Sequence, residues 1–187
     1  MQQLLTWDHL LLRLINEQWR NPFFDWLMPW LRNAPVWAPL YLFLAVFVGI
    51  NFKKTGWWWI LFFAVTVIIT DFFSSTLIKE NIIRLRPCNN PDYTSWLHVM
   101  VGYRPQSSSF TSSHAANHFG LATFFFLTLR KHFGKWPSLF FIWAALICYA
   151  QVYVGVHYPL DVVAGSMIGL VIGYLSGSLF NKKYGLV

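Results

Sequence analysis

Long stretches without a charged side chain are the feature that most limits the fold of this sequence. Four contain no Asp, Glu, Lys or Arg, and they cover residues 33–52, 105–129, 136–160 and 162–181. A further stretch, residues 55–78, is interrupted only by Asp71. Each approaches or exceeds the roughly 20 residues that an α-helix needs to cross the hydrocarbon core of a bilayer. The sequence therefore predicts an all-α fold, an integral membrane bundle of helices.

The composition excludes several other classes of protein. Of the 187 residues, 56% are hydrophobic and 11% are charged, which rules out a disordered chain and a cytosolic nucleic-acid binder despite the net charge of +7. Cys88 lies in a polar segment and Cys148 in an apolar one, so we expect free thiols rather than a secreted disulfide scaffold. We expect one membrane-embedded domain over residues 1–187.

We place five spans at about residues 34–51, 56–77, 113–130, 136–153 and 160–180, joined mostly by short loops. Before them, residues 1–32 carry apolar side chains at helical spacing with charges between, which predicts an amphipathic helix in the membrane interface. Asn21-Pro22 should break that segment. Glycines recur every four residues along the last span and favour close helix packing within the bundle over dimerisation: Gly165, Gly169, Gly173 and Gly177.

The loop charges predict an orientation. With five crossings, one side receives seven basic and no acidic residues: Lys53, Lys54, Arg130, Lys131, Lys135, Lys182 and Lys183. The other side also has seven: Arg13, Arg20, Arg32, Lys79, Arg84, Arg86 and Arg104. The positive-inside rule counts basic residues and gives a tie. Four of the second group lie in one long loop, where they suit anion binding, so we expect the purely basic side to be cytoplasmic.

Three polar clusters lie at span ends on the outer side: Lys79–Pro87, Phe110–His114 and His157–Asp161. Polar groups are costly in a membrane and mark functional sites. Lys79 and Arg86 supply fixed positive charge. Ser112 and Ser113 begin a span, where a hydroxyl and helix-terminal N–H groups bind anions. Together these residues predict an anion-binding site.

The clusters resemble the signature of the type 2 phosphatidic acid phosphatase family over residues 75–170, the expected catalytic core. The first motif, Lys, six residues, then Arg-Pro, is met by Lys79 and Arg86-Pro87. The second, Pro-Ser-Gly-His, is met in part by residues 111–114, with Thr for Pro and Ser for Gly. The third is Ser-Arg, five residues, His, three residues, Asp. Its His and Asp are present as His157 and Asp161, but its Ser-Arg falls on Ala150 and Gln151.

The resemblance implies a membrane phosphatase with roles for three catalytic residues. His157 would attack phosphorus and form a phosphohistidine, and Asp161 would fix the tautomer of its ring. His114 would protonate the leaving oxygen and then activate water. Lys79, Arg86, Ser112 and Ser113 would bind the phosphate. The resemblance implies no cofactor and no metal, and the His114–His118 spacing alone is a weak metal signal.

The departure at Gln151 leaves alternatives open, because the family's arginine there contacts the phosphate and glutamine brings no charge. Arg84 or Arg104, in the same outer loop, would substitute for it. Asp71 is either a buried hydrogen-bonded residue or a support for the phosphate-binding cations. Otherwise the chain is a catalytically impaired phospholipid-binding or transport protein of the same fold. A purely structural membrane subunit is a third alternative.

The expected partners are the membrane and a lipid phosphate presented from it; the sequence does not predict an oligomeric state. Small proteins of the family include hydrolases of undecaprenyl diphosphate, phosphatidylglycerophosphate, phosphatidic acid and lipid A phosphates. We favour undecaprenyl diphosphate, because phosphate release at the outer face fits recycling of a cell-wall carrier, with lipid A phosphate next. The expected location is the bacterial inner membrane, multi-pass, with the site on the periplasmic or outer face. The family often has six spans, so six helices are the alternative to five.

Overall fold

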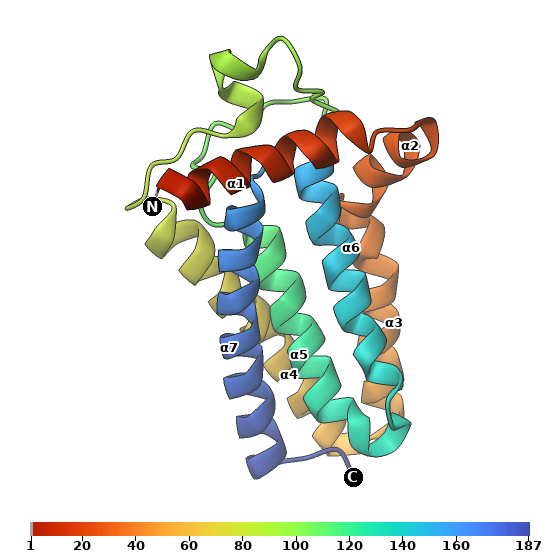
Figure 1. Cartoon of the computed structure of the whole chain (residues 1–187). Helices are drawn as coiled ribbons and strands as arrows, with labels where there is room; N and C mark the ends of the chain where they lie inside the picture. Colours follow the sequence, from red (N-terminus) through yellow and green to blue (C-terminus); the bar gives the residue numbers. More distant parts are fainter. Residues whose placement is uncertain (1) are drawn as a thin grey trace.

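A computed structural model describes residues 2–187, and those residues form helices and loops without any strand. The helices are α1 (Gln2–Arg13), α2 (Pro22–Leu31), α3 (Ala38–Asn51), α4 (Lys53–Asp71), α5 (Ser113–Phe133), α6 (Leu139–Tyr153) and α7 (Pro159–Lys183). Figure 1 shows α3 to α7 side by side as a bundle, with α1 lying across one end. The predicted all-α class is confirmed.

Short helical turns extend or join these helices. A π-helical stretch, Leu14–Gln18, follows α1, and another, Phe72–Ile78, continues α4. Single 3₁₀ turns lie at Ala34–Trp37, Pro87–Asn89, Pro91–Tyr93 and Trp136–Ser138. The long loop between α4 and α5 is therefore mostly irregular, which suits a segment that positions side chains over the end of the bundle.

Four helical segments are long and apolar enough to cross a membrane: Ala34–Asn51, Lys53–Ile78, Trp136–Tyr153 and Pro159–Lys183. They agree with four of the predicted spans to within a few residues. The remaining predicted helix forms as α5, which runs alongside the other four (Figure 1) but is not among the segments of sufficient apolarity. Helix α5 packs against α4, α6 and α7, and its polar residues His118, Thr123 and Thr128 are buried within the protein.

The N-terminal segment is an amphipathic helix, as predicted. The side chains of Leu4 and Trp7 are 61% and 58% exposed, whereas Leu12 and Asp8 of the same helix are buried. The exposed apolar side chains suit contact with the membrane interface. Asn21 ends this segment and caps α2, because its side chain accepts a hydrogen bond of 3.0 Å from the backbone N–H of Phe24.

The glycines of α7 bring its backbone directly against α5. A Cβ atom built at Gly169 would lie 2.3 Å from the carbonyl oxygen of Ala116, and one built at Gly165 would lie 2.4 Å from that of Ser112. Only glycine allows so close an approach. The prediction that these glycines pack within the bundle is confirmed, and the contact sets the first turns of α5 and α7 side by side.

The order of the helices separates two ends of the bundle. The short connections between α3 and α4 and between α5 and α6 lie at the end where the chain terminates, far from α1 (Figure 1). The long loop and the turn before α7 lie at the α1 end. The three motif clusters therefore share one end of the bundle, as their alternation along the chain predicts.

Candidate active site

The turn before α7 presents His157 at the centre of the site. The residue is 2% exposed, and its Nε2 atom lies 3.1 Å from Nη1 of Arg86. A guanidinium only donates hydrogen bonds, so Nε2 accepts and the ring proton is on Nδ1. That nitrogen faces Oδ2 of Asp161 at 3.6 Å. Burial lowers the pKa of His157 to about 4, which leaves the ring neutral at neutral pH with its lone pair beside Arg86.

Asp161 is held from several sides in the first turn of α7. Its Oδ2 accepts a hydrogen bond of 2.9 Å from the backbone N–H of Tyr158 and another from the hydroxyl of Ser109. Its Oδ1 accepts one from Nη1 of Arg84. A fully buried carboxylate requires such partners. They fix the Asp161 carboxylate against the Nδ1 side of the His157 ring.

Arg84 forms ion pairs with two carboxylates, so its guanidinium is not available at the phosphate position. One terminal nitrogen binds Asp161, the other binds Asp8 of α1, and the guanidinium lies 4.0 Å from the ring centre of Tyr158. The hypothesis that Arg84 replaces the missing arginine is wrong for this reason: two carboxylates already compensate its charge. It supports the site through Asp161 instead.

Arg104 lies in the long loop and has an exposed side chain. It lines a cavity of about 80 Å³ with Cys88 and Thr94. The hypothesis that Arg104 substitutes for the missing arginine stays a prediction. Cys88 and Cys148 are both free thiols, as expected.

Arg86 and Lys79 bring positive charge that no carboxylate neutralises. Arg86 is 5% exposed and donates to the carbonyl oxygens of Ser107 and Val156 as well as to the His157 ring. Within residues 2–187, neither cation has a carboxylate within 4.0 Å. Burial, reinforced by the charge of Arg86, lowers the pKa of Lys79 to about 8, against opposite contributions from Asp71 and Asp161. The site thus holds two cations near His157 whose charge no carboxylate within 4.0 Å balances.

The start of α5 carries the second motif. Ser112 caps the helix, its hydroxyl accepting from the N–H of Ala115 at 3.4 Å, and its own N–H donates to the carbonyl oxygen of Asp161 at 3.0 Å. The hydroxyl of Ser113 lies 2.8 Å from that of Ser75. The first of these bonds joins the second motif to the third, and the last contact joins the second motif to the segment Phe72–Ile78.

Asp71 reaches the site through one intermediate side chain. Its carboxylate accepts hydrogen bonds of 3.1 Å from Ser75 and 3.3 Å from Asn117, and Ser75 in turn meets Ser113. Its charge also raises the pKa of Lys79. The structure thus places Asp71 behind the second motif, where it can support Ser113 and Lys79.

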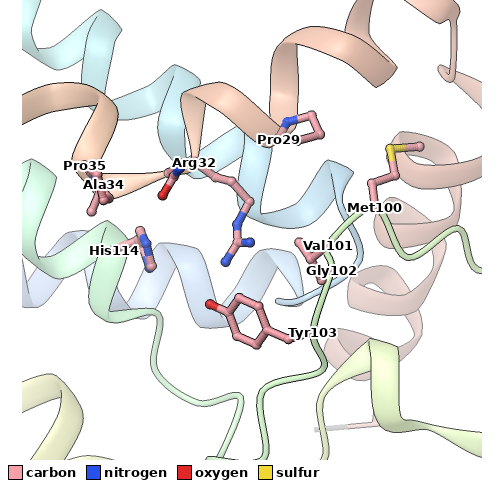
Figure 2. A pocket seen from close by; sticks show the side chains of 10 residues that line it. Pro29, Arg32, Ala34, Pro35, Met100, Val101, Gly102, Tyr103 and His114 are labelled. Carbon is pink, nitrogen blue, oxygen red and sulfur yellow. The ribbon is translucent and has the colours of Figure 1, made fainter.

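A pocket of about 460 Å³ opens beside His114, between the end of α2 and the loop around Gly102. Figure 2 shows the guanidinium of Arg32 extending into it, with the Tyr103 hydroxyl below and the His114 ring to one side. On α6, Gln151 is fully buried, and its Oε1 accepts a hydrogen bond of 3.3 Å from Nε of Arg32. Sequence analysis missed Arg32 as a site residue, because no motif spacing relates it to Gln151.

Unpaired polar atoms concentrate at the motifs. Within residues 2–187, four buried side-chain nitrogen or oxygen atoms have no hydrogen-bond partner: Thr111 Oγ1, Gln151 Nε2, His157 Nδ1 and Trp143 Nε1. The first three belong to the second and third motifs. Buried unpaired groups are costly, and their retention is typical of functional sites.

The histidine pair on α5 does not present a metal-binding arrangement. Nδ1 of His118 lies 2.7 Å from the carbonyl oxygen of His114, and Nε2 lies 3.2 Å from the hydroxyl of Tyr41. Within residues 2–187, no group of three or more His, Cys, Asp or Glu side chains could hold a metal ion. The weak metal signal of the His114–His118 spacing thus has no support in the arrangement of donors.

Comparisons with known proteins identify relatives. The sequence model of the PAP2 superfamily matches residues 56–184. A lipid A 4'-phosphatase of Bacteroides thetaiotaomicron is 34% identical over 166 residues, which cover 87% of this chain and 72% of the relative. An undecaprenyl-diphosphatase of Sulfolobus acidocaldarius is 38% identical over 96 residues, 50% of this chain and 42% of the relative.

Two crystal structures share the fold. The PAP2-type phosphatidylglycerolphosphate phosphatase of Bacillus subtilis superposes with a TM-score of 0.73 at 21% identity, covering 98% of this chain and 89% of its own. Aquifex aeolicus LpxE superposes with a TM-score of 0.63 at 28% identity, covering 89% and 92%. The region matched by the family model contains all three motifs, whereas Arg32 and Asp8 lie outside it.

Proposed function

Since the chain belongs to the PAP2 superfamily and is a bacterial membrane lipid phosphatase, we propose that it transfers the phosphoryl group to His157 and hydrolyses the resulting phosphohistidine without a metal ion. One observation carries this proposal. The unprotonated nitrogen of His157 lies 3.1 Å from Arg86, on the opposite side of the ring from Asp161. A phosphate bound by Arg86 would therefore meet the nucleophilic atom.

The reaction has two steps, phosphoryl transfer to His157 and hydrolysis of the phosphohistidine. Nε2 of His157 attacks phosphorus, the bond from phosphorus to the leaving oxygen breaks, and His114 gives that oxygen a proton. His114 then takes a proton from water, the water oxygen attacks phosphorus, and the bond to Nε2 breaks to release inorganic phosphate. Asp161 stabilises the positive charge that develops on the ring through the Nδ1 side.

Lys79 and Arg86 stabilise the transferring phosphoryl group. Its negative charge spreads over the equatorial oxygens in the transition state, so preorganised cations contribute most of the catalysis. The hydroxyls of Ser112 and Ser113, together with N–H groups of the first turn of α5, orient the group. Asp71 keeps Ser113 in place through Ser75.

The substrate we propose is a phosphate of lipid A, with undecaprenyl diphosphate as the second candidate. From the sequence alone undecaprenyl diphosphate was the first candidate. Lipid A now comes first because a lipid A 4'-phosphatase matches most of this chain. We further propose that the site faces the periplasmic side of the inner membrane, because the opposite end carries the purely basic connections. The exposed apolar side chains of α1 would hold that end at headgroup level.

The test is phosphate release by the detergent-purified chain from lipid A, undecaprenyl diphosphate, phosphatidylglycerophosphate and phosphatidic acid, with and without EDTA. We expect release that EDTA leaves unchanged, fastest with lipid A. Loss of activity in EDTA, restored by a divalent cation, would contradict metal independence. A faster reaction with phosphatidic acid or phosphatidylglycerophosphate would contradict both proposed substrates. Absence of release from every lipid by folded protein would favour the binding-protein alternative.

Lys79 gives the reaction a predicted alkaline limit. Its ammonium binds phosphate only when protonated, so kcat/KM should fall tenfold per pH unit above about 8, the lowered pKa of the free enzyme. In Lys79→Arg the limit should move above pH 10, because arginine keeps its charge. Initial rates at low substrate between pH 6 and 10 measure both. A profile whose alkaline limit is the same in the variant would show that another group is responsible.

A further inference from the structure

We propose that Arg32 supplies the phosphate-binding guanidinium that the third motif lacks at Gln151, and that Gln151 is the positioning residue that holds it. The inference rests on the proposed function and deepens it, since it adds a ligand to the same site. Gln151 brings no charge, and Arg84 does not replace it because both of its terminal nitrogens are paired, with Asp8 and Asp161.

The backbone around Arg32 is fixed by the end of α2. Its N–H donates to the carbonyl oxygen of Met28 at 3.2 Å, and Nε1 of Trp37 donates to that of Leu31 at 2.8 Å. From this point the side chain extends into the pocket beside His114 (Figure 2). The guanidinium therefore extends from a fixed helix end into the pocket that His114 lines, beside Gln151.

The charge of Arg32 is not compensated by protein. Arg13, Arg20 and Arg84 each have a carboxylate partner, and Arg32 has none within 4.0 Å among residues 2–187. Burial lowers the pKa of Arg86, and the charge of Arg32 lowers it as well, against opposite contributions from Cys88, Asp161 and Tyr103. Two cations of one site that have no carboxylate within 4.0 Å favour an anion as their partner.

Gln151 is suited to hold an arginine but not to replace one. Because a guanidinium only donates, the amide must turn its oxygen toward Nε of Arg32. This single bond leaves the terminal NH₂ groups of Arg32 without a partner within residues 2–187. The amide NH₂ of Gln151 is also buried and unpaired. Both sets of donors fit the oxygens of a phosphate, and an arginine at 151 would instead repel Arg32.

Removal of Arg32 is the first test. We expect Arg32→Met to lower kcat/KM for the best lipid by about 10²- to 10³-fold, the usual effect of losing one transition-state donor. Inhibition by orthovanadate, a mimic of the transition state, should weaken by a similar factor. Arg20→Met is the matched control, because this arginine lies in the same N-terminal segment and pairs with Asp25. Activity of folded Arg32→Met within threefold of wild type would overturn the proposal.

Variants at Gln151 separate a phosphate ligand from a structural side chain. Gln151→Glu keeps an acceptor for Arg32 and strengthens their bond, but it neutralises the charge. We expect thermal stability to be retained while kcat/KM falls at least tenfold. Arg32→Met with Gln151→Arg moves the guanidinium to the family's position and should be at least tenfold more active than Arg32→Met alone. Full activity of Gln151→Glu, or a folded double variant no better than the single one, would count against the proposal.

Failure of this inference can be told apart from failure of the proposed function. If wild type releases phosphate and Arg32→Met does so equally well, only the inference fails. If wild type releases none, binding of orthovanadate, followed as a rise in the unfolding temperature, still tests Arg32 as an anion ligand. Binding lost in Arg32→Met and retained in Arg20→Met would then support the ligand without the enzyme.

Discussion

Replacing His157 with alanine should abolish turnover, lowering kcat by at least about 10⁴-fold, because loss of a covalent nucleophile leaves only the residual catalysis of the binding groups. Wild type quenched within one turnover of ³²P-labelled substrate should carry a label that is stable to base and labile to acid, as phosphohistidine is. His157→Ala should carry none. Rapid quenching followed by electrophoresis measures the label, and phosphate release measures turnover.

Two further variants make this result interpretable. Because His157 is buried, alanine leaves a cavity and removes one of the acceptors of Arg86. His157→Gln, which keeps that acceptor, checks whether the fold survives. His132→Ala is the matched control, since His132 contacts the carbonyl oxygen of Leu186 at the other end of the bundle. Turnover by either His157 variant within tenfold of wild type, with the label still present, would rule out His157 as the nucleophile.

Much of the fold follows from the sequence because a bilayer permits few solutions. Backbone polar groups must be satisfied within the segment that crosses the lipid, so a long uncharged stretch becomes a helix. The stretches at residues 33–52, 55–78, 136–160 and 162–181 form α3, α4, α6 and α7 for this reason. Helix α5 was also predicted. Its first turns are polar, and it is not among the segments apolar enough to cross a membrane.

The motif residues were also predictable, because each motif is local and lies at the end of a span. Spans that alternate in direction must bring those ends to one side of the bundle. His157 and Asp161 share the turn into α7, and Ser112 caps α5 beside it. The order of the spans was sufficient to group them.

Contacts between distant segments could not be predicted in the same way. The sequence analysis placed α1 in the membrane interface, yet the helix also buries Asp8 against Arg84. The sequence therefore offered Arg84 as a candidate for the phosphate and left Arg32 among the loop charges. Which charge meets which partner depends on how α1 and α2 lie over the bundle, and no spacing in the sequence encodes that arrangement.

The second large effect should come from Asp8, which lies far from the phosphate position. Its fully buried carboxylate binds Arg84 through one oxygen and accepts a hydrogen bond of 2.8 Å from the N–H of Leu160 through the other. Asp8→Ala removes one partner of a buried pair, which costs about 3–5 kcal/mol in comparable sites. The unfolding temperature in detergent should fall markedly, and kcat should fall with it because Arg84 also holds Asp161.

The matched control for Asp8 is an exposed ion pair of the same segment. Glu17 pairs with Arg13 at 2.6 Å, with 31% and 55% of their side chains exposed. Pairs of this kind contribute at most about 1 kcal/mol, so Glu17→Ala should leave stability and kcat nearly unchanged. Asp8→Asn, which keeps an acceptor for Leu160 but no charge, should fall between the two. If Asp8→Ala were no less stable than Glu17→Ala, α1 would not be held to the catalytic turn through Arg84, and the interfacial helix would have to be fixed by its apolar contacts alone.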